Sequence, residues 1–204
     1  MTTIVLASGN RKKLDELQRI LAAKAVNFVP QSTFDVRDAD ETGLSFVENA
    51  LIKARHASAL TQLPALADDS GIEVDALEGE PGIYSARFAA MHGKGNGDDA
   101  NNALLLDLLK HTPEAQRRAR YHCAIVLLRH ARDPMPLICL GSWEGSILTT
   151  PRGAQGFGYD PLFYVPTHHC SAAELAPEIK NAISHRAIAL RQLLQQWPHL
   201  SGDK

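Results

Sequence analysis

The chain has few cysteines and no long hydrophobic run. Its 204 residues include three cysteines, none of them in a CxxC pair, which favours a reduced, intracellular protein over a disulfide-built secreted one. No apolar stretch approaches the roughly 20 residues that a membrane-spanning helix needs, and the apolar run near the N-terminus is too short for a signal peptide. We therefore expect a soluble cytoplasmic protein with no membrane partner.

The chain also lacks an excess of either charge. Lysine and arginine total 21 against 23 for aspartate and glutamate, so the formal net charge is −2. A protein that coats long nucleic acid carries a broad basic face, so this balance predicts no nucleic-acid partner. Any bound anion is expected to be small and held by a local cluster. Hydrophobic residues make up 45% of the chain, which excludes a disordered chain and allows a sizeable core.

Hydrophobic periodicity predicts alternating strands and helices in the first third of the chain. The expected elements are strands at 3–8 and 26–30 and helices at 12–24 and 45–60. Asn10 or Ser8 is expected to cap the first helix. Ser45 and Glu48 have the spacing of a capping box at the second helix.

The rest of the chain mixes strands with helices. The expected strands are 64–69, 71–77, 118–131, 136–149 and 161–165, and a last helix covers 184–197. The first two of these strands are expected to meet at a polar corner, and the third and fourth to form an antiparallel hairpin. Asp98 is expected to cap a helix, and Ser171 with Glu174 forms a second capping box. This order predicts an α/β fold with a mixed sheet flanked by helices.

The segment "SGNRKK" joins an expected strand to an expected helix. Gly9 allows backbone N–H groups to converge at the turn, and the helix N-terminus adds the positive end of its dipole. Lys12 and Lys13 add two charges, which suits a phosphate, although the GxxxxGK[ST] loop is absent. The alternative is an ordinary helix N-terminus with solvated lysines.

Acidic residues gather in two polar segments. Glu41 lies in "DADETG" before the 45–60 helix, and Asp68, Asp69 and Ser70 form "DDS" after an apolar run. Burying a carboxylate without compensation is costly, and Mg²⁺ would neutralise such acids while keeping waters and substrate phosphates as ligands. The alternative is a solvated turn, because Asp-Asp-Ser-Gly is also good turn chemistry.

Two later segments carry further candidates. In "GFGYDP" Phe157 is placed to stack on a base and Asp160 to order hydrogen bonds at its edge, unless the aromatic residues only anchor the loop. In "KNAISHRAIAL" Ser184 is expected to cap a helix, so that His185 and Arg186 present donors at its N-terminal end.

In order along the chain, these segments resemble the inosine/xanthosine triphosphate pyrophosphatase family. The matching segments are "SGNRKKLDE", "ETGLSFVENALIKA", "ALADDSGIEVDALEGEPGIYSAR", "GFGYDPLF" and "KNAISHRAIAL". They extend over residues 4 to about 194, and several are long and specific. The resemblance implies an elongated mixed β-sheet flanked by helices, with two lobes around a central nucleotide-binding cleft. It further implies one bilobed domain over 1–197, a short tail over 198–204 and a homodimer.

The implied activity is hydrolysis of the α–β phosphoanhydride bond of ITP, dITP and XTP, with Mg²⁺ as cofactor. The resemblance assigns the phosphates to Ser8, Gly9, Asn10, Arg11, Lys12, Lys13 and Lys53. It assigns the base to Phe157, Gly158, Tyr159, Asp160, Lys180, His185 and Arg186. Ser70 would touch the substrate, and Arg87 is a further candidate for a phosphate contact.

The implied catalytic residues are Asp69, Lys13 and Lys53, and the implied metal ligands are Glu41 and Asp69. A free aspartate is a weak base at neutral pH, so Asp69 acts as one only if a metal acidifies the water or if Asp68 raises its basicity. Two alternatives remain from the sequence: a related pyrophosphatase for other modified nucleotides, and a nucleotide sensor without turnover.

Overall fold

The structure is a computed structural model that describes residues 3–10, 13–14, 17 and 26–196. The chain divides into two compact units. Unit 1 comprises the described residues of 1–69, 123–141 and 186–204, and unit 2 comprises residues 70–122 and 142–185. The chain thus passes from one unit to the other after Asp69, His122, Gly141 and His185.

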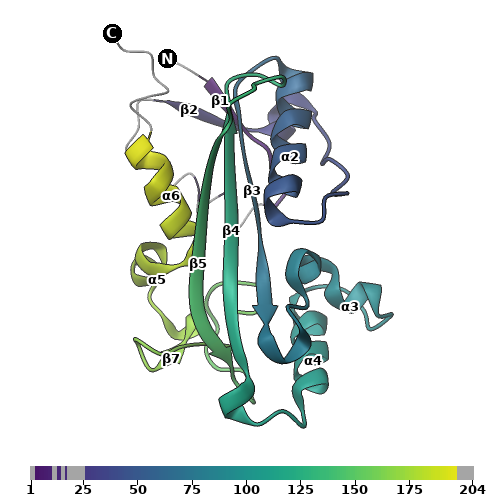
Figure 1. The fold of residues 1–204 in the computed structure, drawn as a ribbon, viewed down its shortest axis with the longest axis vertical. Helices are drawn as coiled ribbons and strands as arrows, with labels where there is room; N and C mark the ends of the chain where they lie inside the picture. Colours follow the sequence, from purple (N-terminus) through teal and green to yellow (C-terminus); the bar gives the residue numbers. More distant parts are fainter. Residues whose placement is uncertain (1–2, 11–12, 15–16, 18–25, 197–204) are drawn as a thin grey trace. The chain divides into compact units, whose positions relative to one another are not determined.

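The strands form one mixed sheet with the order β2-β1-β3-β4-β5-β6-β7 (Figure 1). Their bounds are β1 Thr3–Leu6, β2 Asn27–Pro30, β3 Ala65–Val74, β4 Arg118–Leu128, β5 Leu137–Ile147, β6 Phe163–Val165 and β7 Cys170–Ser171. Strand β1 pairs in parallel with β2 and β3, whereas β6 pairs antiparallel with β5 and β7. The predicted mixed sheet is therefore confirmed. Neighbours β4 and β5 are joined by eight residues, too few for a parallel crossover, which favours the predicted hairpin.

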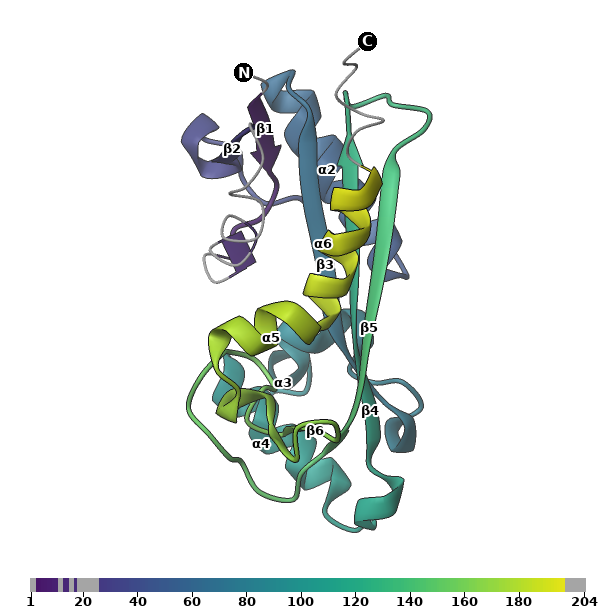
Figure 2. The same ribbon diagram turned by 90° about the vertical axis from the view of Figure 1, so that its left-hand side faces the viewer.

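Helices flank the strands, as the order of the expected elements predicts (Figures 1 and 2). Their bounds are α2 Phe46–Thr61, α3 Phe88–Met91, α4 Asp98–Leu109, α5 Pro177–Ile183 and α6 His185–Gln196. Short 3₁₀ helices cover Gln31–Phe34, Asp75–Leu77, Gly82–Arg87, Glu114–Gln116 and Ala172–Glu174. The helices predicted at 45–60 and 184–197 correspond to α2 and α6. No helix among the described residues is long and apolar enough to span a membrane.

In unit 1 the sheet is covered on both faces, because successive strand residues point to opposite sides. Ile4 and Leu6 of β1 pack in a core with Leu190 of α6. Val5 of β1 packs in a second core, which contains Ala54 of α2. Helix α2 therefore covers one face of this part of the sheet, and α6 covers the other.

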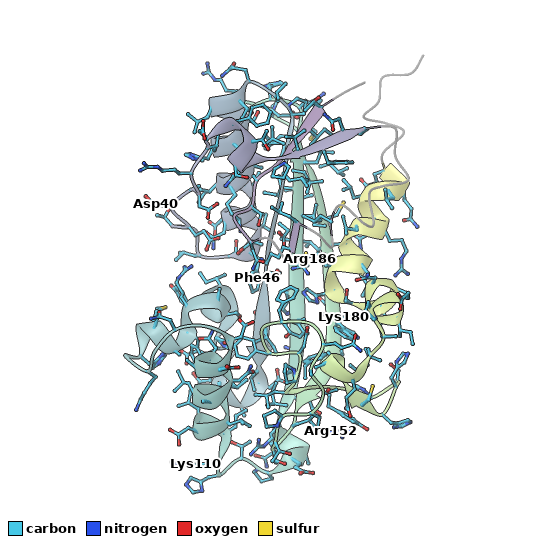
Figure 3. All side chains as sticks on the ribbon, turned by 180° about the vertical axis from the view of Figure 1, so that it is seen from behind. Asp40, Phe46, Lys110, Arg152, Lys180 and Arg186 are labelled. Carbon is cyan, nitrogen blue, oxygen red and sulfur yellow. The ribbon has the colours of Figure 1, made fainter. Side chains whose placement is uncertain are left out.

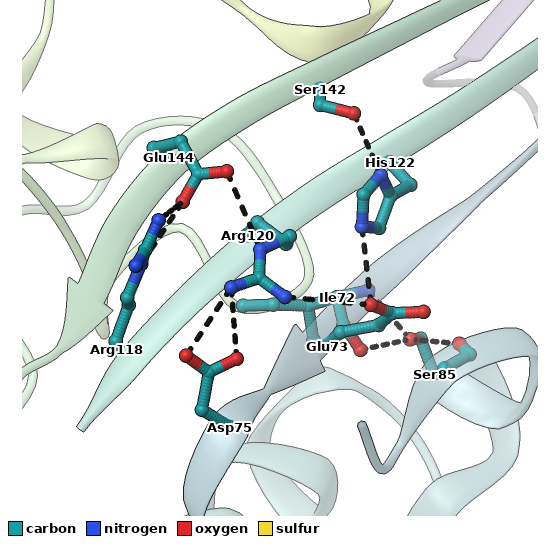
Figure 4. A network of polar contacts seen from close by, with 10 residues as sticks. Ile72, Glu73, Asp75, Ser85, Arg118, Arg120, His122, Ser142 and Glu144 are labelled. Atoms are coloured by element: carbon teal, nitrogen blue, oxygen red, sulfur yellow. Dashed lines mark hydrogen bonds and ion pairs between the residues drawn. The ribbon is translucent and has the colours of Figure 1, made fainter. Parts of the chain in front are cut away.

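In unit 2 one face of the sheet is apolar and the other is polar. Helix α4 and the segment 159–165 pack on the apolar face, which includes Trp143. On β4 the opposite face carries Arg118, Arg120 and His122 at every second position. Arg120 contacts carboxylates at 2.9–3.9 Å, and the close view shows this network (Figure 4).

The predicted capping boxes are confirmed at one helix and modified at the other. Ser171 and Glu174 form both reciprocal bonds. At α2 the Ser45 hydroxyl accepts from the Glu48 N–H at 3.2 Å, but the Glu48 carboxylate accepts from the N–H of Leu44 at 2.9 Å instead of that of Ser45. The Glu48 side chain therefore also holds Leu44, the residue before the N-cap Ser45.

Two sequence-based expectations about local structure are wrong. The expected strands 64–69 and 71–77 are one continuous strand, β3, so Asp68 and Asp69 lie inside a strand and not at a turn. Asp98 is the first residue of α4, and the N-cap is Gly97, whose positive φ suits glycine. The Asp98 carboxylate accepts from the Gly158 N–H at 2.8 Å instead.

Some expectations concern residues outside the described part of the chain. Lys13, Leu14 and Leu17 are helical, but the rest of the predicted 12–24 helix lies outside the described residues. The tail predicted at 198–204 lies outside them as well.

Candidate active site

The first group of candidate residues follows β1, where Ser8, Gly9 and Asn10 form a turn. The Ser8 hydroxyl accepts from the Asn10 N–H, and the Asn10 side-chain oxygen accepts from the Lys13 N–H, both at 3.2 Å. Asn10 is therefore the cap of the helix that begins here. Gly9 approaches Asp38 so closely that a Cβ at this position would overlap with the Asp38 carboxylate. Arg11 and Lys12 lie outside the described residues.

The parallel register brings this turn beside the acidic part of β3. Leu6 pairs with Leu66, and the Ala7 N–H donates to the Leu66 carbonyl at 2.8 Å. The chain after β1 therefore lies alongside the residues after Leu66. In open α/β sheets, ligands bind at this carboxyl end of parallel strands.

Alternation along β3 gives the two adjacent aspartates different partners. Asp68 follows Leu66 on the α6 side, where its buried carboxylate lies 3.4 Å from the Lys13 ammonium and 3.2 Å from the Arg186 guanidinium. Burial alone would raise the pKa of Asp68, but the charges of Lys13 and Arg186 hold this pKa well below its ordinary value. Asp68 is thus an ionised partner of two cations at neutral pH.

Asp69 points to the α2 side, where it meets Lys53. The Lys53 ammonium donates to Asp69 at 2.8 Å and to Glu41 at 3.0 Å. Burial raises the pKa of Asp69, and the nearby Lys53 only partly offsets this effect. Burial also disfavours the charged form of Lys53, but the carboxylates of Asp69, Asp68 and Glu41 outweigh it and raise the Lys53 pKa. Burial is thus the largest cause of the raised Asp69 pKa, and the role of Asp69 as a base stays a prediction.

Helix α2 fixes both Lys53 and the segment that carries Glu41. Asn49 lies one turn before Lys53, is buried, and accepts from the Gly43 N–H at 2.9 Å. Together with the bond from Leu44 to Glu48, this contact ties residues 43–44 to the first turn of the helix. Glu41 is thereby held near the end of Lys53. We call Lys13, Glu41, Lys53, Asp68 and Asp69 the acid–lysine cluster.

The acid–lysine cluster has a donor set that suits a hard cation. The second carboxylate oxygen of Asp69, Oδ2, is buried and accepts no hydrogen bond from the described residues. Such an atom is costly unless a cation or another donor reaches it. No group of three or more His, Cys, Asp or Glu side chains within the described ranges is arranged to hold a metal. An ion bound here would therefore take further ligands from water or substrate, as Mg²⁺ commonly does.

The second group of candidates lies in unit 2, in the loop 156–160. Asp160 is buried, and its carboxylate accepts from the Phe157 N–H at 2.9 Å and from the Lys180 ammonium at 2.5 Å. The same ammonium lies 5.0 Å from the centre of the half-buried Phe157 ring, within cation–π distance. Gly156 has φ +78°, and a Cβ there would overlap with the Asp160 carboxylate.

Tyr159 is part of the core. It is buried, and its hydroxyl donates to the Ser85 carbonyl at 2.9 Å. Its neighbour Gly158 is held to α4 through the Asp98 carboxylate and through the Asn102 amide, which donates to the Gly158 carbonyl at 2.9 Å. For Tyr159 the structure favours the loop-anchoring interpretation, and its substrate contact stays a prediction.

The chain neighbours His185 and Arg186 have different surroundings. The His185 ring is buried and lies parallel to Tyr121, with ring centres 4.6 Å apart and planes at 8°. Arg186, at the beginning of α6 (Figure 3), contacts Asp68 in unit 1. Arg186 is thus grouped with the acids, and its predicted contact with the base stays a prediction. We call Phe157, Asp160, Lys180, His185 and Tyr121 the aromatic–lysine cluster.

Ser70 and Arg87 lie close to these groups in the chain. Ser70 is half-buried in β3, directly after Asp69. The Arg87 guanidinium lies 5.2 Å from the centre of the Tyr84 ring. The contacts predicted for Ser70 with substrate and for Arg87 with phosphate stay predictions.

Sequence reasoning placed Asp68 in the acidic segment but did not predict its contacts with Lys13 and Arg186, and it missed Tyr121. For Asp68 the signal was the unbroken stretch "ALADDS", which has no proline or glycine before Gly71 and therefore fits one strand better than a turn. For Tyr121 the signal was alternation, since Ala119, Tyr121 and Cys123 occupy one face of β4 and are all buried.

The mixed sheet and the acid–lysine cluster at the end of its parallel strands define an α/β protein with a site suited to phosphates. The chain belongs to the Ham1 family, whose model matches residues 4–196. A dITP/XTP pyrophosphatase of Xanthomonas oryzae pv. oryzae is 55% identical over 201 residues, 98% of this chain and 100% of that protein.

A dITP/XTP pyrophosphatase of Vibrio cholerae is 52% identical over 195 residues, 96% of each chain. Among solved structures, a HAM1 protein from Coxiella burnetii is 51% identical, with a TM-score of 0.90 over 98% of this chain and 100% of that one. The relatives therefore match this chain over almost its whole length.

Proposed function

We propose that this protein hydrolyses the non-standard purine nucleoside triphosphates dITP, XTP and ITP to the monophosphate and pyrophosphate. Such an enzyme clears these nucleotides from the pool and prevents their incorporation into DNA and RNA. The observation that carries the proposal is the acid–lysine cluster, in a chain more than half identical to proteins named dITP/XTP pyrophosphatases over at least 96% of its length.

In this proposal the turn after β1 and the two lysines hold the phosphates. The bond to be broken lies in a chain of anionic groups, so an approaching water meets accumulated negative charge. Lys13 and Lys53 offset that charge and stabilise the departing pyrophosphate. Asp68 keeps the Lys13 ammonium in place, since the two groups are 3.4 Å apart and largely buried.

Asp69 is the proposed proton acceptor for the attacking water. The water oxygen forms a bond to the α-phosphorus, its proton passes to the Asp69 carboxylate, and the bond to the β-phosphate oxygen breaks to release pyrophosphate. In the metal-free protein burial raises the pKa of Asp69, which makes the carboxylate a stronger base than a solvated aspartate and supports this role. Lys53 keeps the carboxylate oriented through its 2.8 Å contact.

Glu41 and Asp69 are the proposed ligands of Mg²⁺. Their carboxylates contact one ammonium, that of Lys53, and Asp69 has a buried oxygen that no described residue satisfies. When bound, Mg²⁺ would neutralise phosphate charge and lower the pKa of a coordinated water.

The aromatic–lysine cluster is the proposed recognition site for the base. A half-buried aromatic ring such as Phe157 offers a stacking surface, and His185 offers donors to an oxygen at purine C6. An amino group at C6, as in ATP, would leave such a donor facing another donor, and an unpaired buried polar group gives strong discrimination. The resemblance to the family also supports a homodimer and a cytoplasmic location as parts of the proposal.

One experiment tests the activity. The protein is incubated with ITP, dITP, XTP, GTP and ATP in the presence of Mg²⁺, and the products are separated by ion-exchange chromatography. The expected products are monophosphate and pyrophosphate, with turnover of the first three substrates far above that of the last two. Orthophosphate as the first product would contradict the bond assignment, and equal turnover of ITP and ATP would contradict the assignment of the base.

A further inference from the structure

The Tyr121 side chain contacts two other members of the aromatic–lysine cluster, His185 and Asp160. On one side its ring lies flat against His185, with ring centres 4.6 Å apart and planes at 8°. On the other side its hydroxyl lies 3.5 Å from the Asp160 carboxylate, at the long end of the hydrogen-bond range. Tyr121 belongs to β4, whereas His185 begins α6 and Asp160 closes the loop 156–160.

Tyr121 is itself rigidly placed. It is buried, its ring centre lies 4.7 Å from that of Phe163 at a tilt of 54°, and it stacks at 6.3 Å on Trp143. Burial and the nearby Asp160 carboxylate raise the pKa of the phenol well above its ordinary value, so the hydroxyl stays protonated. Tyr121 therefore presents a fixed, uncharged ring face to the His185 imidazole.

The stack on Tyr121 covers a face of the His185 ring and not its hydrogen-bonding edge. Both imidazole nitrogens direct their hydrogens or lone pairs within the ring plane. A partner stacked at 8° fixes that plane without occupying its edge. Any in-plane hydrogen bond of His185 then lies in a plane that is parallel to the ring of Tyr121.

We propose that Tyr121 is a positioning residue for purine selectivity, which fixes the ring plane of His185 by stacking on it. This inference rests on the proposed function, because it assumes that His185 contacts the base. Tyr121 touches neither the reacting phosphates nor, in this proposal, the base. It acts through His185 alone, so its contribution must disappear when the imidazole is removed.

The test measures kcat/KM for dITP and dATP with wild type, Tyr121→Phe, Tyr121→Met and His185→Ala. Methionine fills a similar volume without a flat face, whereas phenylalanine keeps the face and loses only the hydroxyl. Tyr121→Met is expected to lower the dITP:dATP ratio on the order of tenfold, as for loss of one aromatic contact, and Tyr121→Phe to leave it nearly unchanged. In a His185→Ala background, Tyr121→Met is expected to change the ratio no further.

Two outcomes overturn the inference: a folded Tyr121→Met protein with the wild-type ratio, and equal losses from Tyr121→Met with and without His185. A second measurement does not depend on activity or on a variant. In the wild-type NMR spectrum the ring proton between the His185 nitrogens is expected to be shifted upfield by the phenol ring, and an unshifted signal also overturns the inference. Absence of dITP turnover by the wild type would instead count against the proposed function.

Discussion

The acid–lysine cluster and the aromatic–lysine cluster each contain a lysine–carboxylate pair, but the surroundings of the two pairs differ. In the first, Lys53 contacts two carboxylates, and Asp69 keeps one buried oxygen without a partner among the described residues. In the second, Lys180 contacts the carboxylate of Asp160, which also accepts a backbone N–H and lies among aromatic rings.

In our proposal this difference separates the residues that carry out hydrolysis from those that select the base. A cluster with an open carboxylate oxygen and two cations is suited to bind further charge, such as a metal or phosphates. A cluster whose carboxylate is already satisfied is suited to hold a loop in one shape. We therefore expect changes in the first cluster to affect turnover of every substrate, and changes in the second to affect the choice among substrates.

The largest effect is expected from Asp69→Asn. The variant keeps the side-chain volume but removes the proposed proton acceptor, so kcat for dITP is expected to fall by at least about 10³-fold. Circular dichroism is expected to show an unchanged fold. The matched control is Asp107→Asn, an exposed aspartate on α4, which should behave as wild type. An Asp69→Asn protein with substantial turnover would remove Asp69 from the mechanism.

The next effect is expected on stability, from Asp68→Asn. The variant leaves the buried Lys13 and Arg186 cations without their shared carboxylate, which is expected to lower the free energy of unfolding by about 3 kcal/mol. Because the folded-state pKa of Asp68 is depressed, this stabilisation is present above the ordinary aspartate pKa. It is lost as the pH falls through the folded-state value.

Urea unfolding at pH 7 measures this loss, with Asp107→Asn again as the control. A loss of stability no greater than that of the control would show that Asp68 is not the partner that holds Lys13 and Arg186.

A smaller effect is expected from Phe157→Ala. Loss of a stacking surface is expected to raise KM for dITP about tenfold, in line with a contribution of roughly 1–3 kcal/mol per stacked base, with kcat changed less. Phe34→Ala is the control, because Phe34 is an exposed aromatic residue of unit 1. Steady-state kinetics give both constants, and an unchanged KM would mean that Phe157 only anchors its loop.

Much of the fold and of the acid–lysine cluster was predictable from sequence, because helices and strands depend on local patterns. The periodicity of residues 45–60 and the Ser45–Glu48 pair gave α2 nearly to the residue, since burial and capping act over one or two turns. The family resemblance assigns site roles to Lys13, Lys53, Glu41 and Asp69. The structure brings these side chains together in the acid–lysine cluster.

The missed features depend on tertiary context. "DDSG" is good turn chemistry, and its strand conformation follows from the place of β3 between β1 and β4 in the sheet, which local sequence does not encode. The separation of Asp68 from Asp69 then follows from alternation along that strand. The stack of Tyr121 on His185 joins residues 64 positions apart, so no local pattern predicts it.

A further prediction concerns the titration of the two adjacent aspartates. Carbon-detected NMR of the metal-free protein, assigned with Asp69→Asn and Asp68→Asn, is expected to give a midpoint above the ordinary value for Asp69 and well below it for Asp68. Burial dominates at Asp69, and the two cations dominate at Asp68. Midpoints in the reverse order would contradict the separation of their roles.

The most direct test of the account compares Lys13→Ala with His185→Ala. The quantity measured is the ratio of kcat/KM for dITP to kcat/KM for dATP. Lys13→Ala is expected to lower both values by the same factor, about 100-fold, so that the ratio is unchanged, and Lys110→Ala on the surface serves as its control. His185→Ala is expected to lower the ratio itself. A changed ratio in Lys13→Ala together with an unchanged ratio in His185→Ala would contradict the account.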